Sequence, residues 1–194
     1  MIAVIDYKAG NTRSVTNALD RLQVTYQLTA DPATIAAASH VILPGVGYAA
    51  AAMQALRAAN LDKLIVTLQQ PVLGICLGMQ LLYTSSAEGP TECLGILPGT
   101  VQPLPAGELL VPHMGWNDIQ ETRPSPLLRG IENDTCYYMV HSYYAPVCGH
   151  TIARCDYGLP ITVAVQKDNF YGVQFHPEKS GKQGQQLLQN FLTL

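Results

Sequence analysis

A thiol between two glycines is the first group in this chain that could do chemistry. An apolar run ends in Gly74-Ile75-Cys76-Leu77-Gly78, and apolar residues with helical spacing continue to Thr84. A Gly-x-Cys-x-Gly turn between a strand and a helix has the form of a nucleophile elbow, with Cys in the position that Ser usually holds. The free N–H groups at the start of a helix stabilise a negatively charged sulfur. The pattern therefore predicts that Cys76 is a nucleophile, and the alternative is a buried, inert Cys in a Gly-rich turn.

A histidine with a carboxylate two residues later could supply the matching base. The stretch 170–176 is predicted to be a strand, and Pro177 stops it. Because residues two apart in an extended chain point to the same side, we expect Glu178 to reach the His176 imidazole. A carboxylate at one ring nitrogen fixes the tautomer and leaves the other nitrogen to face a thiol. Cys76, His176 and Glu178 would then form a triad of nucleophile, base and orienting carboxylate.

Other interpretations of this histidine stay open. A lone His near the end of a strand is often only a surface residue, and His-x-Glu also opens the signature of the zinc deaminases. That signature continues with Pro-Cys-x-x-Cys, which this chain lacks, so we expect no metal. Among the other histidines, we expect His40 and His150 to be structural, and His113 and His141 to lie near the pocket.

Acyl chemistry also needs N–H donors for a developing oxyanion, and the loss of one such donor typically costs about 3 kcal/mol. The backbone N–H of Leu77 is one candidate, because this residue opens the predicted helix. We expect the second from Val46 and Gly47, in a Pro-Gly-Val-Gly loop that follows a predicted strand and precedes a helix. Its two glycines allow a peptide to flip at low cost. The alternative is an ordinary tight turn.

Composition indicates one globular domain over residues 1–194. The chain is 48% hydrophobic and 13% charged, and its formal net charge of -3 with no Lys/Arg run argues against a nucleic-acid partner. No apolar run approaches the length of a membrane span, and the first residues do not have the pattern of a signal peptide. Five cysteines occur without a Cys-x-x-Cys pair. We therefore expect a cytoplasmic protein without disulfides, metal or another cofactor, and without a membrane partner.

Alternating strand and helix patterns in the first half predict a parallel sheet that is covered on both faces. Strands are expected at 2–5, 24–28, 40–43 and from 72, helices at 15–22, 48–59 and 61–69, and a turn at 31–32. The second half is expected to add antiparallel strands at 99–104, 109–119, 136–145, 151–156, 161–166 and 170–176. A last helix at about 181–192 has Gln183, Leu187, Leu188 and Phe191 on one stripe. The predicted fold class is α/β, with a mixed, mostly parallel central sheet flanked by helices and additional antiparallel strands in the C-terminal half.

These motifs carry a resemblance to a known family. Gly-Ile-Cys-Leu-Gly-Met-Gln together with Phe-His-Pro-Glu resembles the class I, or triad, glutamine amidotransferases. Within that family, the stretches 44–47, 111–117, 138–143 and 174–181 are similar to the glutaminase subunits of imidazole glycerol phosphate synthases. The likeness covers nearly the whole chain. The glutaminase subunits of other synthases, such as those that make anthranilate or pyridoxal phosphate, are the alternative. A third alternative is a catalytically silent binding subunit or a Cys-based redox sensor on the same fold. Such a protein would need no base, so the presence of His176 and Glu178 argues against it.

The resemblance implies an activity and roles for the site residues. Cys76 would attack the side-chain amide of glutamine, and Leu77, Val46 and Gly47 would hold the oxyanion. His176 would transfer the proton, and Glu178 would orient the His176 ring. The residues that would bind the substrate glutamine are Gln80, His141, Ser142 and Tyr143.

The products would be glutamate and ammonia, and the ammonia would pass to a cyclase subunit that resembles a (β/α)₈ barrel, in a heterodimeric synthase (a lyase) of histidine biosynthesis. Residues near the partner face or the ammonia exit would be Asn11, Trp116, Tyr138 and Lys179. Ten tyrosines against three phenylalanines also fit an interface, where a ring with one polar end is favoured.

Overall fold

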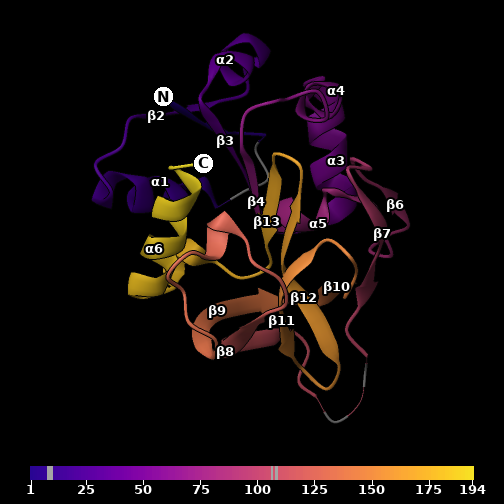
Figure 1. Cartoon of the computed structure of the whole chain (residues 1–194). Coiled ribbons are helices and arrows are strands. Elements are labelled where there is room, and N and C mark those ends of the chain that lie inside the picture. The colour runs from indigo at the N-terminus through magenta and orange to yellow at the C-terminus, as the bar shows by residue number, and fades with distance from the viewer. Residues whose placement is uncertain (8–10, 106, 108) are drawn as a thin grey trace.

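The chain folds into a mixed sheet with helices packed on both faces (Figure 1). This computed structural model describes residues 1–7, 11–105, 107 and 109–194. Its helices are α1 (Thr12–Arg21), α2 (Pro32–Ala37), α3 (Ala49–Ala58), α4 (Leu61–Ile65), α5 (Leu77–Gln80) and α6 (Gly181–Phe191), with 3₁₀ turns η1 (Pro126–Leu128) and η2 (Pro177–Lys179). Its strands are β1 (Ile2–Ile5), β2 (Tyr26–Thr29), β3 (His40–Gly45), β4 (Val72–Cys76), β5 (Tyr83–Ser86), β6 (Thr91–Glu92), β7 (Leu97–Pro103), β8 (His113–Glu121), β9 (Thr135–His141), β10 (Tyr143–Pro146), β11 (Thr151–Asp156), β12 (Pro160–Lys167) and β13 (Phe170–Val173).

The parallel part of the sheet has the order β2-β1-β3-β4-β13. Successive residues of β1 enter opposite cores: Val4 packs in the cluster that contains α1 and α6, and Ile5 in the cluster that contains α3 and α4. Burial on both faces explains why these strands are continuous apolar runs, as is usual for parallel sheets. The last strand of the chain, β13, lies directly beside β4, so segments about a hundred residues apart become neighbours.

The second half of the chain extends the sheet with antiparallel strands. Strand β12 pairs antiparallel with β13 and with β10, and β10 pairs antiparallel with β7. Strand β7 then pairs parallel with β5 from the first half of the chain, and β5 pairs antiparallel with β6 at the edge. A branch runs from β12 through β11 to β8 and β9 (Figure 1). The predicted fold class is therefore confirmed. No helix in the described ranges is long and apolar enough to cross a membrane.

The helix expected after Cys76 is much shorter than predicted. It ends at Gln80 after one turn, and residues 83–86 form strand β5 instead. The backbone N–H groups of Leu94 and Leu97 donate to the carbonyls of Leu81 and Leu82, so this segment pairs with a distant loop. A short apolar run fits a buried strand as well as a helix, and here tertiary pairing decides between them.

Other differences are local. Residues 31–32 open helix α2 rather than a turn, because Asp31 caps it by accepting from Thr34 N at 2.8 Å and Pro32 occupies its first position. Helix α4 ends at Ile65, and Gln183 is exposed while Gly184 is buried in its place. Several strands also begin or end at residues other than those predicted. Strand β2 begins at 26, β8 begins at 113 and β13 ends at 173, and the stretch 136–145 is divided at 142 into β9 and β10.

Two glycines bring α5 against the ends of β3 and β4. A Cβ added to Gly74 would lie 2.6 Å from the carbonyl oxygen of Gly78, and one added to Gly78 would collide with the carbonyl oxygen of Leu43. The obstacle in both cases is backbone, which cannot rotate away as a side chain can. Only residues without a Cβ allow this close approach of helix and strands.

We predict that Gly78→Ala destabilises the protein by about 2–3 kcal/mol, because overpacking against backbone forces the strands apart. Urea denaturation of the full chain measures this. Gly149→Ala is the matched control, since nothing lies within 4 Å of a Cβ built there, and it should be neutral or stabilising by up to about 1 kcal/mol. Equal stability of the two variants would contradict the packing argument.

Candidate active site

Cys76 lies at the carboxyl end of β4, in a backbone conformation that non-glycine residues rarely adopt. Its φ and ψ are 55° and -112°, and 7% of the residue is exposed. Its sulfur makes polar contacts with Gln174 Nε2 at 3.7 Å and the Val140 carbonyl oxygen at 3.8 Å. A cysteine with a strained backbone at the turn from strand to helix has the geometry of a nucleophile elbow.

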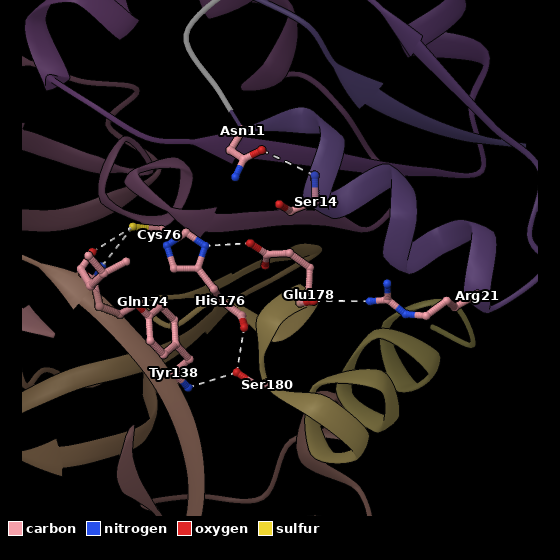
Figure 2. Close-up of polar contacts among 10 residues, drawn as sticks. Asn11, Ser14, Arg21, Cys76, Tyr138, Gln174, His176, Glu178 and Ser180 are labelled. Carbon is pink, nitrogen blue, oxygen red and sulfur yellow. Dashed lines mark hydrogen bonds and ion pairs between the residues drawn. The ribbon is translucent and has the colours of Figure 1, made fainter. Parts of the chain in front are cut away.

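His176 is brought beside Cys76 by the pairing of β13 with β4. Residues Val173 and Ile75 are partners in that pairing, and both chains continue from there toward the same edge of the sheet. His176 is 2% exposed, and Figure 2 shows its imidazole between the Cys76 sulfur and the Glu178 carboxylate. The carboxyl ends of adjacent parallel strands are where α/β proteins usually bind their ligands.

Glu178 reaches the imidazole, but by a route that differs from the expected one. Glu178 Oε1 lies 2.7 Å from His176 Nδ1, and both side chains are almost fully buried. The strand ends at Val173, and Glu178 belongs to the 3₁₀ turn η2, so the alternation of a strand is not what brings the two together. A carboxylate at Nδ1 directs the other ring nitrogen, Nε2, toward the sulfur.

The charge of His176 is set by these two neighbours. Burial alone lowers its pKa, but the proximity of Cys76 and the hydrogen bond with Glu178, together with the negative charges of both, raise the pKa from 6.5 to about 9. Among the described residues, Nε2 has no hydrogen-bond partner, and Figure 2 shows the ring beside the Cys76 sulfur. The ring can therefore hold a proton at neutral pH and give it to a group bound at the sulfur.

The backbone around His176 is held by a serine that sequence reasoning missed. Ser180 Oγ donates to the His176 carbonyl at 2.6 Å and accepts from Tyr138 N at 3.0 Å, and His176 N donates to the Tyr138 carbonyl at 3.0 Å (Figure 2). Arg21 Nη2 donates to the Glu178 carbonyl at 3.3 Å. These contacts fasten η2 to β9 and α1. Ser180 lies inside the His-Pro-Glu-Lys-Ser-Gly stretch, which was the available signal.

A cavity of about 310 Å³ opens over Cys76 and His176. The structure brings all of the expected oxyanion and substrate residues to its wall. Gly47 has φ of 96°, a conformation that favours glycine, and Val46 is exposed at the mouth. The predicted residues that line the cavity are Val46, Gly47, Leu77, Gln80, His141, Ser142 and Tyr143.

Gln80 is bound within the protein more tightly than expected. Its Nε2 donates both to the Tyr143 carbonyl at 3.0 Å and to Gln174 Oε1 at 2.8 Å. Both amide hydrogens are thus used, and only its oxygen is left for a ligand. Gln174 is fully buried and links Gln80 to the Cys76 sulfur. A polar residue between Val173 and Phe175 was the sequence signal for it.

Glu88 is another residue that sequence reasoning missed. It lines the cavity, and its Oε2 accepts from Ala49 N at the start of α3 at 2.7 Å. A carboxylate held there can bind a cationic group of a ligand. Nothing in the sequence around Glu88 indicated this placement, because it follows β5, where a helix was expected.

Three of the four residues expected at a partner face or ammonia exit lie together. Trp116 packs edge-on against Tyr138 with ring centroids 6.2 Å apart, and Lys179 Nζ lies 5.8 Å from the centre of the Tyr138 ring. Trp116 is 57% exposed. Asn11 instead caps α1 by accepting from Ser14 N at 3.5 Å and borders a small cavity beside His176 and Glu178.

The other histidines and cysteines divide as their burial suggests. His113 and His141 are buried beside the cavity, whereas His40 packs edge-on against Phe191. Burial raises the pKa of Cys93 to about 11 and of Cys155 to about 12.

Within the described ranges, no cluster of His, Cys, Asp and Glu has the geometry to hold a metal ion. A buried thiol, a cationic imidazole and a carboxylate in line can carry out nucleophilic acyl transfer.

Comparisons with known proteins identify the family of this chain. The model of the family "Glutamine amidotransferase class-I" matches residues 3–194. Curated relatives named imidazole glycerol phosphate synthase subunit HisH cover the whole chain: the protein of Yersinia pseudotuberculosis is 48% identical over 194 residues (99% of its length), and that of Bacteroides thetaiotaomicron is 50% identical over 195 residues (99% of its length). The HisH of Vibrio cholerae is 45% identical over 199 residues, with 100% of this chain and 98% of the relative covered.

Solved structures support the same fold at low sequence identity. A crystal structure of a glutamine amidotransferase superposes with a TM-score of 0.77 at 17% identity, covering 100% of this chain and 98% of that one. The PurLQS structure from Thermotoga maritima gives a TM-score of 0.73 at 19% identity, covering 99% of this chain and 97% of that one. The chain belongs to the class-I glutamine amidotransferase family, and within it to the family of HisH subunits.

Proposed function

We propose that this chain is the glutaminase subunit of an imidazole glycerol phosphate synthase, formed by one glutamine amidotransferase domain over residues 1–194. It hydrolyses glutamine to glutamate and ammonia and transfers the ammonia to a cyclase subunit. The observation that carries the proposal is the alignment of Cys76, His176 and Glu178 at the floor of a cavity, in a chain whose full-length relatives are named HisH.

Acylation begins with the thiolate of Cys76, which attacks the side-chain carbonyl carbon of glutamine. Negative charge moves to the carbonyl oxygen, where the N–H groups of Leu77 and of the Val46–Gly47 peptide stabilise it. The His176 imidazolium gives its Nε2 proton to the amide nitrogen, ammonia leaves, and a thioester remains. Glu178 stabilises the imidazolium at Nδ1 throughout.

In deacylation the proton moves toward His176 instead of away from it. The neutral His176 takes a proton from a water molecule, and the oxygen of that water attacks the thioester carbon. Glutamate is released, and the Cys76 thiolate and His176 imidazolium are restored. No other acid or base is required, because the same ring serves both half-reactions.

The cavity walls match the two charged groups at the other end of glutamine. Glu88 provides a carboxylate for the α-ammonium group. His141, Ser142 and Tyr143 present backbone and hydroxyl groups for the α-carboxylate. Gln80 supports this wall by donating to the Tyr143 carbonyl.

We predict that His176→Asn lowers glutamine hydrolysis at least about 100-fold, because both proton transfers are lost. Ammonia release by the chain with its cyclase partner measures this. Mass mapping after treatment with a glutamine-derived electrophile should still find Cys76 labelled, in preference to the buried thiols of Cys93 and Cys155 or the exposed Cys136. His150→Asn, in a turn outside the cavity, is the matched control and should retain activity. Label on Cys93 or Cys136 alone would rule out Cys76 as the nucleophile.

We predict that the His176 imidazole titrates near pH 9, above its usual 6.5. Its raised pKa means that the proton is bound below about pH 9 and lost above it, so the acid that ammonia departure needs disappears as the pH rises. NMR of the full chain with ¹⁵N-labelled histidine follows the ring directly. In Cys76→Ala the pKa of His176 should fall, because burial still lowers it and one of the two groups that raise it has been removed. A wild-type value near 6.5 would contradict the assigned proton.

We predict that a cyclase subunit co-purifies with the full chain from a native extract and that Trp116→Asp weakens this binding at least tenfold. A Trp at the centre of an interface typically contributes about 2 kcal/mol or more. Mass spectrometry identifies the bound chain, and titration calorimetry measures the affinity. Val66→Asp, an exposed apolar residue after α4, is the control. An equal loss for both variants would rule out a specific role of Trp116.

A further inference from the structure

A chain of side-chain hydrogen bonds outside the triad ends at the cavity wall. Asn117 Nδ2 lies 3.3 Å from His113 Nε2, and His113 Nδ1 lies 3.0 Å from His141 Nε2. His141 Nδ1 lies 2.9 Å from the Tyr143 carbonyl oxygen. We call these residues, Asn117, His113 and His141, the histidine relay. It crosses from β8 to β9, where His113 and His141 are paired partners.

The direction of the relay is fixed at its outer end by the orientation of the Asn117 amide. The Asn117 Oδ1 atom accepts from Asp118 N at 2.9 Å, and Nδ2 donates to the Asp156 carbonyl at 3.2 Å. A backbone N–H can only donate and a carbonyl can only accept, so the amide cannot be reversed. The atom that faces His113 is therefore a donor.

Each later link follows from the one before. Because His113 Nε2 accepts from Asn117, its hydrogen is on Nδ1, and this group donates to His141 Nε2. His141 then carries its hydrogen on Nδ1 and donates to the Tyr143 carbonyl. This carbonyl can only accept, so the inner end of the relay requires the same assignment as the outer end. Both rings are neutral Nδ1–H tautomers.

Burial keeps the two rings neutral. His113 and His141 are 4% and 6% exposed, and the Tyr157 ring stacks on His113 with centroids 3.8 Å apart. Burial lowers the pKa of each histidine to about 4. A second proton on His141 would also set two N–H groups against each other between the rings.

The relay ends on an atom that the cavity wall depends on. The Tyr143 carbonyl also accepts from Gln80 Nε2 at 3.0 Å. Gln80 donates further to Gln174, whose Nε2 lies 3.7 Å from Cys76 Sγ. Loss of His113 would leave His141 Nε2 buried without a hydrogen-bond partner, and the ring that donates to the Tyr143 carbonyl would no longer be held in one tautomer.

We propose that His113 and Asn117 are positioning residues, which fix His141 as the Nδ1–H tautomer and thereby hold the 141–143 wall in place for glutamine. The proposal rests on the glutaminase function proposed above. It predicts an effect chiefly on substrate binding, because the relay ends directly on the Tyr143 carbonyl of the wall, whereas it reaches Cys76 only through two further side chains, Gln80 and Gln174. A change that only loosened the fold would instead reduce the active fraction, which lowers kcat at unchanged KM.

The tautomers are tested first, by NMR of the full chain with ¹⁵N-labelled histidine, which distinguishes protonated from unprotonated ring nitrogens. We expect Nδ1–H and bare Nε2 on both His113 and His141 at pH 7. Nε2–H on either ring would overturn the relay. This measurement does not use glutamine, so it stands even if the wild-type chain proves not to be a glutaminase.

Kinetics with the cyclase partner then test the role. We expect His113→Phe, which keeps a ring against Tyr157 but removes the donor, to raise KM for glutamine about tenfold with little change in kcat. Asn117→Ala should act in the same direction if the first variant does not fold. The matched control is His40→Phe, a half-buried histidine at the start of β3, which should leave both constants unchanged. Wild-type KM in His113→Phe or Asn117→Ala, while the wild-type enzyme is active, would overturn the positioning role.

Discussion

The direct contact of backbone with backbone at the ends of β3 and β4 is the constraint on which the site depends. A Cβ on Gly45 would lie 2.7 Å from Gly78 N, and one on Gly74 would lie 2.6 Å from Gly78 O. With no side chain between them, α5 sits directly on the strand ends and forces Cys76 into its strained turn. Pairing of β4 with β3 on one side and β13 on the other holds that strain.

Burial makes the electrostatics of the site interdependent. The Glu178 side chain is 2% exposed, and a carboxylate taken out of water is costly unless a partner compensates it. His176 is that partner, and the same burial that would remove its proton strengthens its attraction to the two negative groups. Removing His176 would leave the buried Glu178 carboxylate without its compensating partner, so the two residues depend on each other. The Ser180 and Tyr138 contacts supply the rigidity that this arrangement requires.

The features that could be predicted from the sequence are those that short local motifs encode. Cys76 in its glycine turn and His176 with Glu178 were identifiable because a few adjacent residues define the chemistry. The resemblance then placed His141 and its neighbours at the cavity. By contrast, Glu88 reaches the cavity only through the packing of distant loops, and the short length of α5 depends on pairing with residues 94–97. Such long-range pairing leaves no periodic signal in the sequence.

Strand β8 joins two features that a synthase subunit would have to couple. Its alternate residues face opposite ways: Met114 and Trp116 are exposed, while His113 is buried and begins the path to the cavity wall. A strand cannot shift one face without moving the other, since both sets of side chains share one backbone. A partner that binds at Trp116, as proposed above, would contact the same strand whose His113 bonds His141. Differential binding of that partner to two positions of β8 would change glutamine affinity without a contact between partner and substrate.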